Sequence, residues 1–243
     1  MSQSETPVPG ASVSRLLEVA TQLFRLTVLK CLSLAMLAVL CEEIPSLYWM
    51  ASGHRLDRGL PSGPTYWLLE LGAAAVTLYI ASAMMLQQRA LIAGASLSSW
   101  LALREAARRL PLLLVTWMLA QLSLLVGLSL LVLPGLFLFV CYLLMLPVVL
   151  FEHPNPYMVL VRCVLLVRPN WWRTFAALVI AALVVLVFVL AFVAILGIVG
   201  AVLTGPLFQA IATACSIAFF AATLVFMSAL VLTLHSAAAS SSA

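Results

Sequence analysis

Two adjacent glutamates, Glu42 and Glu43, interrupt an apolar stretch that is otherwise typical of a membrane helix. A third carboxylate, Glu70, lies in the next apolar stretch. Aromatic pairs at 48–49 and 66–67 are typical of the belt at a membrane surface, and they place all three carboxylates roughly one to two helical turns below it. Ionisable side chains at such a depth are rare and often functional, so the sequence predicts an intramembrane acidic cluster.

Three roles for this acidic cluster follow from the residue types. The loop between the two stretches carries His54, Arg55 and Arg58, which could pair with the carboxylates, or one glutamate could stay protonated. Alternatively, the carboxylates could couple proton or cation movement to transport. A metal or catalytic site is the third interpretation, although no histidine cluster or spaced ligand set accompanies the glutamates.

A further carboxylate, Glu152, ends an apolar stretch and precedes three arginines, Arg162, Arg168 and Arg173. A structural clamp between Glu152 and one of these arginines is the simplest interpretation. General acid–base chemistry by Glu152 and His153 is the alternative, but no nucleophile or phosphate-binding loop lies nearby in the sequence. We therefore predict a clamp at this position.

The composition excludes a water-soluble protein. Of the 243 residues 65% are hydrophobic and only 8% are charged, whereas soluble domains have about 25% charged residues. No Asp, Glu, Lys or Arg follows Arg173. The net charge of +4 does not indicate nucleic-acid binding, because the basic residues lie at the ends of apolar stretches. No catalytic or nucleotide-binding motif is present, so we expect no enzymatic activity, no metal and no cofactor.

The apolar stretches predict an all-α fold with six transmembrane helices. Proline and glycine favour tight turns, so Pro134 and Gly135 are expected to split one long run. A single domain at 12–236 is expected, flanked by disordered ends at 1–11 and 237–243. The predicted spans are 28–50, 65–87, 110–133, 136–151, 174–199 and 207–234, each close to the ~20 residues that a crossing needs.

The distribution of basic residues predicts the orientation of these helices. With six spans, Arg55 and Arg58 fall on one side of the membrane and the ten other Lys and Arg residues fall on the opposite side. Because Lys and Arg are enriched on the cytoplasmic side, both termini should be cytoplasmic. The N-terminus lacks a cleavable signal pattern, and we expect the inner membrane of a bacterium.

A short basic segment precedes each pair of spans, at 14–25, 98–109 and 162–173. The first segment has the apolar spacing of a one-faced helix. Before the third segment, Asn155 followed by Pro156 is typical of the beginning of a helix. We therefore expect three hairpins, each preceded by an amphipathic helix in the membrane interface, with Trp171 and Trp172 in the inner aromatic belt. The candidates for contact with lipid headgroups are Arg25, Arg104, Arg108 and Arg109.

A longer pattern spans residues 133–175. It contains a Pro-Gly turn, an apolar stretch that ends in Pro-Val and a glutamate, a short helix and a basic segment with tryptophans. The residues that carry it are Pro134, Gly135, Pro147, Val148, Glu152, Arg162, Arg168, Asn170, Trp171, Trp172 and Arg173. The pattern resembles the YciC-like group of bacterial six-helix inner-membrane proteins, related to the membrane domain of some glycerophosphoryl diester phosphodiesterases.

This resemblance implies a six-helix fold and an inner-membrane location, and it implies no reaction. We expect no phosphodiesterase chemistry from these residues, because they include no sequence typical of the soluble barrel domain that performs it. Two positions depart from the group, which commonly has serine at Cys163 and glycine at Pro169.

Together these features predict a non-enzymatic envelope protein that binds lipids, with anionic headgroups as the expected ligands, or a membrane-protein partner. The alternative is a small transporter or lipid-moving channel that uses Glu42, Glu43 and Glu70.

Overall fold

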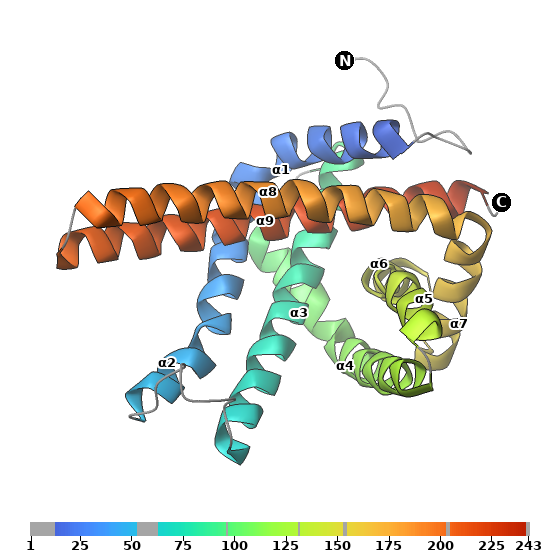
Figure 1. The fold of residues 1–243 in the computed structure, drawn as a ribbon. Coiled ribbons are helices and arrows are strands. Elements are labelled where there is room, and N and C mark those ends of the chain that lie inside the picture. The colour runs from blue at the N-terminus through green and yellow to red at the C-terminus, as the bar shows by residue number, and fades with distance from the viewer. Residues whose placement is uncertain are drawn as a thin grey trace.

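The computed structural model describes residues 13–52, 63–95, 97–130, 132–152, 155–202 and 205–241, and all regular secondary structure in these ranges is helical. The elements are α1 (Val13–Glu42), α2 (Ile44–Ala51), α3 (Pro64–Ile92), α4 (Ser99–Leu130), α5 (Val132–Tyr142), α6 (Met145–Phe151), α7 (Pro156–Val167), the 3-10 turn η2 (Arg168–Asn170), α8 (Trp171–Val202) and α9 (Pro206–Ser241), as Figure 1 shows.

Six helical segments within the described residues are long and apolar enough to cross a membrane. This confirms the prediction of an all-α, multi-pass membrane protein. The six segments are Val13–Ala51, Pro64–Ile92, Ser99–Leu130, Val132–Phe151, Pro156–Ala201 and Phe208–Ser240.

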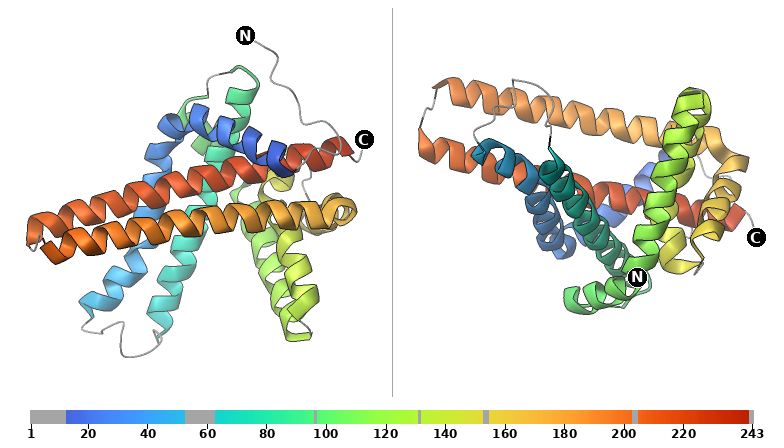
Figure 2. Two further views of the ribbon diagram at one scale, coloured as in Figure 1. Left: turned by 45° about the horizontal axis from the view of Figure 1, so that its top comes forward. Right: turned by 90° about the horizontal axis from the view of Figure 1, so that it is seen from below.

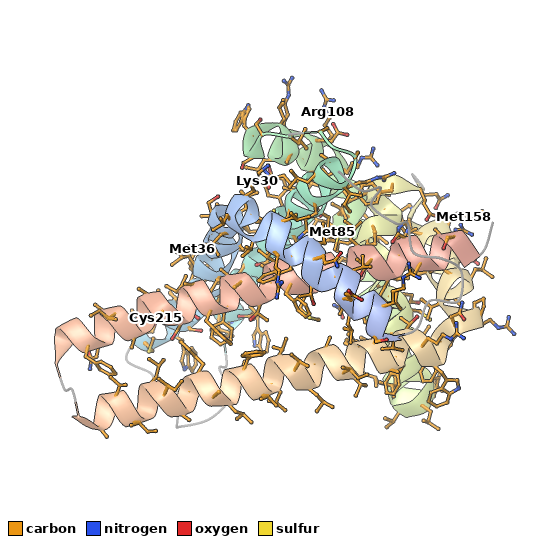
Figure 3. All side chains as sticks on the ribbon, turned by 90° about the horizontal axis from the view of Figure 1, so that it is seen from above. Lys30, Met36, Met85, Arg108, Met158 and Cys215 are labelled. Atoms are coloured by element: carbon orange, nitrogen blue, oxygen red, sulfur yellow. The ribbon has the colours of Figure 1, made fainter. Side chains whose placement is uncertain are left out.

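The predicted basic segments at 14–25 and 98–109 are not separate helices, because α1 and α4 each run without interruption into the following span. The ribbon of α1 nevertheless changes direction near Lys30 (Figure 3). Close to this point the buried Thr27 hydroxyl donates to the Leu23 carbonyl, over 2.8 Å. Such back-bonding to the preceding turn commonly bends a helix. In α4 the basic segment meets the span at Pro111, whose ring disturbs the helical hydrogen bonds.

The stretch with Glu42 and Glu43 lies at the interruption between α1 and α2. Pro45 follows two residues later and has no backbone N–H, so the carbonyl of Cys41 lacks its usual helical donor. Helical bonding resumes at once, because the Leu47 amide donates to the Glu43 carbonyl over 3.0 Å. The interruption is therefore local, and α1 and α2 together form one apolar segment.

Pro134 and Gly135 do not form the predicted turn. They lie in the first turn of α5, where a missing proline N–H costs little. Gly135 instead permits close packing of α5 on α4, since a Cβ there would lie 2.4 Å from Leu128 Cδ2. Gly127 of α4 lies at the same contact, where an added Cβ would lie 3.3 Å from the Cα of Gly135.

The third basic segment forms α7 and η2. Asn155 caps α7 by accepting a hydrogen bond from the Tyr157 amide over 3.1 Å, and Pro156 occupies the first turn, as the sequence predicted. The helix ends before Pro169, and α8 begins at Trp171. The amphipathic and interfacial character of these segments stays a prediction.

The C-terminal boundary of the domain differs from the prediction. Residues 237–241 were expected to be disordered, but α9 continues to Ser241. Alanine has the highest helix propensity of all residues, and Ala238 of α9 is itself buried in the core. The N-terminal segment predicted to be disordered lies outside the described residues.

Helix α9 forms the most extensive helix–helix contact of the described chain, along α1. Its buried residues include Ala229, which packs against Leu23 of α1. Buried polar side chains add ties between helices: the Gln88 amide donates to the Ser228 hydroxyl over 2.9 Å, and Cys31 donates to Gln87 over 3.5 Å. Small residues and interhelical hydrogen bonds are the usual means of helix association in membranes.

Within the described residues, α8 is buried only near its beginning, at Thr174, Ala177 and Ala181. Beyond that point most of its large apolar side chains are exposed, including Phe188 and Ile198 at 61% and 69%. Figures 1 and 2 show α8 and α9 crossing the other helices, with the end of α8 and the beginning of α9 protruding from the rest of the molecule. This apolar surface is suited to contact with lipid.

We predict that Gly135→Ala destabilises the protein by on the order of 1–3 kcal/mol, because the new methyl group overlaps Leu128 of the neighbouring helix. The measurement is thermal unfolding of the detergent-solubilised protein. Gly72→Ala in α3 is the matched control, since nothing lies within 4 Å of a Cβ there. The control should be neutral or slightly stabilising. Equal unfolding temperatures for the two variants would contradict the close α4–α5 contact.

Candidate functional site

Glu152 follows the last residue of α6 and connects two further helices. Its Oε2 accepts a hydrogen bond from Arg162 Nε of α7 over 2.8 Å, and its Oε1 lies 2.7 Å from His235 Nε2 of α9. The clamp predicted from the sequence is confirmed for Arg162. Arg168 and Arg173 are exposed instead.

His235 was missed as a site residue, because sequence reasoning placed it in a frayed end. It lies 83 residues from Glu152 along the chain, and its side chain is only 11% exposed. One signal pointed to it: after Arg173 no Asp, Glu, Lys or Arg occurs, so a histidine there is exceptional.

The environment of Glu152 favours its ionised form. Partial burial raises the pKa of the carboxyl group, but the hydrogen bonds from Arg162 and His235 outweigh burial, and the pKa lies below its ordinary value of 4.5. The carboxylate is therefore charged at neutral pH and binds its two basic partners in that state.

Arg109 of α4 connects to the C-terminal end of α6. Its Nη1 donates to the carbonyls of Val149 (over 3.4 Å) and Leu150, and its Nε lies 3.6 Å from Glu105. A cation at this end of a helix meets carbonyls without helical donors and the negative end of the helix dipole.

Arg89 of α3 lies next to the same end of α6. Its guanidinium carbon is 3.9 Å from the centre of the Phe151 ring, a cation–π contact. The sequence indicated Arg89 only as part of the charge distribution, because its contact with Phe151 joins segments far apart in the chain.

An open pocket of about 390 Å³ lies between α3, α4 and α6. Two guanidinium groups and otherwise apolar side chains surround it. The lining residues are Leu86, Arg89, Ala90, Ala93, Arg109, Leu150 and Phe151.

The charges around this pocket do not cancel. The arginines outnumber the carboxylates by two with His235 neutral, since Arg89, Arg108, Arg109 and Arg162 lie around Glu105 and Glu152. The arrangement can hold an anion. No group of three His, Cys, Asp or Glu side chains in the described part of the chain could hold a metal ion.

The three predicted acidic residues lie elsewhere. Glu42 ends α1, Glu43 lies at the α1–α2 interruption and Glu70 lies in α3, and all three are exposed on the protein surface. The neighbouring aromatic residues do meet, since the rings of Trp49 and Tyr66 lie 5.7 Å apart between α2 and α3. The proposed loop partners His54, Arg55 and Arg58 lie outside the described residues, as does His153.

The remaining predicted residues lie at the surface. Arg25 and Arg104 are exposed, and Arg108 is 66% exposed with Glu105 at 3.5 Å. Figure 3 shows Arg108 pointing outward on the same edge of the molecule as Lys30.

The two tryptophans differ in exposure. Trp171 is half-buried, with its ring stacked 5.1 Å from that of Phe175, whereas Trp172 is 74% exposed. An exposed tryptophan at a helix end suits a membrane interface.

No protein-family model, curated protein or solved structure matches this chain. The resemblance to the YciC-like group therefore stays a prediction.

We predict that Glu152→Gln lowers stability at pH 7 by on the order of 1–3 kcal/mol, because Arg162 loses its charged partner. The pKa of Glu152 is lower in the folded protein than its ordinary 4.5, so its contribution is present above pH 4.5 and is lost as the pH falls through the folded-state value. Thermal unfolding of both proteins between pH 7 and pH 3 should show their difference shrinking in acid.

The control for this prediction is Glu105→Gln, since the pairs of Glu105 with Arg108 and Arg109 are exposed. Its effect should stay within about 0.5 kcal/mol at every pH. A Glu152→Gln effect as small as that of the control would rule out the clamp as a stabilising contact.

Proposed function

We propose that this protein is a non-enzymatic membrane protein that binds lipids through their anionic headgroups. The observation that carries the proposal is the position of its arginines. Arg104 and Arg108 are exposed in the first turns of α4, and Arg25 is exposed in the N-terminal half of α1, before the apolar stretch of that helix that could cross a membrane. The apolar outer surface of α8 and its neighbours would contact the acyl chains of the same lipids.

The energy available from such contacts is substantial. A basic side chain near an anionic membrane surface contributes about 1 kcal/mol. The cytoplasmic leaflet is the negatively charged one, which agrees with our inference from the basic residues that both termini are cytoplasmic. A bacterial inner membrane is the location we propose on the same grounds.

A membrane-protein partner with an acidic surface would use the same exposed arginines, and the experiment below distinguishes it from lipid. The transport alternative depends on Glu42, Glu43 and Glu70. Their exposure on the surface gives no support to a shared internal site.

We predict that Arg25→Gln, Arg104→Gln and Arg108→Gln together reduce the affinity for anionic lipid on the order of 100-fold, at about 1 kcal/mol for each side chain. The measurement is the ratio of phosphatidylglycerol to phosphatidylcholine that stays with the protein after purification from vesicles of both lipids. A protein partner would instead co-purify with the wild type from native membranes. If the arginine variant lost this partner but kept the same lipid ratio, partner binding and not lipid binding would be the function of these arginines.

The control carries Glu42→Gln, Glu43→Gln and Glu70→Gln, which remove three negative charges where the arginine variant removes three positive ones. This control should leave the lipid ratio of the wild type unchanged. If it removes phosphatidylglycerol as strongly as the arginine variant, the acidic residues form the site and the proposal is wrong.

A further inference from the structure

The pocket between α3, α4 and α6 has the chemistry of a defined anion site. We propose that it binds the phosphate group of one anionic lipid, with Arg89 and Arg109 as the donors. The inference rests on the proposed lipid-binding function and assigns to it a particular place. It differs from the general attraction of exposed arginines, because a built pocket retains one lipid molecule in one position.

Both arginines have donors available for a ligand. Within the described residues, Arg89 makes no hydrogen bond or ion pair, and its guanidinium is held by the Phe151 ring. Arg109 uses Nη1 on the carbonyls of α6, while its Nη2 has no acceptor in the same part of the chain. Guanidinium groups bind phosphate oxygens through paired, charge-assisted hydrogen bonds, so two of them around one cavity suit a phosphate.

The neighbouring carboxylates do not occupy these donors. Glu152 directs its two oxygens to Arg162 and His235, away from the pocket arginines. Glu105 lies near Arg109 but is 40% exposed, and it also pairs with Arg108. The excess positive charge at this open pocket therefore favours an anion as its ligand.

The rest of the lining favours a lipid over a soluble phosphate. Leu86, Leu150 and Phe151 present apolar surface beside the two guanidinium groups. A glycerol backbone and the first acyl carbons would bury part of this surface, at roughly 25 cal/mol for each Å², whereas inorganic phosphate would not. A volume of about 390 Å³ admits a headgroup and its glycerol, and lies in the usual range of ligand pockets.

Two small residues keep the pocket open. Ala90 and Ala93 occupy its α3 side, where a larger side chain would fill the space without changing any charge. Ala90→Leu thus tests the cavity itself, and Arg89→Gln tests one of its donors. Arg173→Gln is the matched control, since Arg173 is exposed at the beginning of α8 and does not line the pocket.

The experiment is native mass spectrometry of the full-length protein titrated in detergent with phosphatidylglycerol, phosphatidylcholine or inorganic phosphate. We expect one tightly held phosphatidylglycerol on the wild type, about tenfold weaker binding for Arg89→Gln and for Ala90→Leu, and a change below about twofold for Arg173→Gln. Thermal unfolding of each variant verifies that it is folded, and a folded Ala90→Leu with reduced binding supports the cavity.

Other results would overturn the inference in different ways. Suppose that Arg89→Gln and Arg173→Gln weaken phosphatidylglycerol binding equally and that Ala90→Leu does not change it. General charge attraction would then explain the binding, and the proposal of a specific pocket would be wrong. If the wild type bound phosphatidylglycerol no more strongly than phosphatidylcholine, the proposed function would be wrong as well. Displacement of the lipid by an equal concentration of inorganic phosphate would show that the site recognises soluble phosphate and not a lipid.

Discussion

One end of the molecule depends on the contacts that the Glu152 carboxylate makes. Its two oxygens bind side chains that lie 10 and 83 residues away, on α7 and α9. A charged carboxylate that is only 19% exposed needs such partners, because loss of either leaves a poorly solvated charge. The contact also fixes the last turn of α6, and with it the positions of Phe151 and of the carbonyls that bind Arg109. The shape of the pocket therefore depends on an ion pair whose residues do not line the pocket.

The rest of the helix assembly is held by weaker means. Water does not drive apolar helices together inside a lipid phase, so close packing and polar side chains must do so. Alanines at the α1–α9 contact permit close approach, and Gln88 hydrogen bonds to Ser228 within that region. The glycine pair of α4 and α5 serves the same purpose, and the Ser123 hydroxyl of α4 also donates to the Tyr142 hydroxyl of α5 over 3.0 Å. Each such contact involves only a few atoms, which explains why a single methyl group can disturb it.

Sequence reasoning found the features that depend on neighbouring residues. Apolar length alone predicts the six spans, and Asn155 with Pro156 predicts a helix beginning through local hydrogen bonding. Glu152 and Arg162 are also close in sequence. By contrast, His235 and Arg89 take part in the site through tertiary contacts, which no local pattern encodes. The predicted turn at Pro134 was wrong because proline is as acceptable in the first turn of a helix as between helices.

The length of α8 has a consequence for the surrounding bilayer. Its 32 residues extend about 48 Å at 1.5 Å per residue, compared with a hydrocarbon core of about 30 Å. The helix is apolar nearly throughout, and it runs beside α9 while crossing the other helices (Figure 1). Such hydrophobic mismatch is relieved by tilting, so a thicker bilayer would bring α8 closer to upright and a thinner one would incline it further. The inclination of α8 thus depends on membrane thickness, while the contact of Glu152 with His235 holds the C-terminal part of α9 in place.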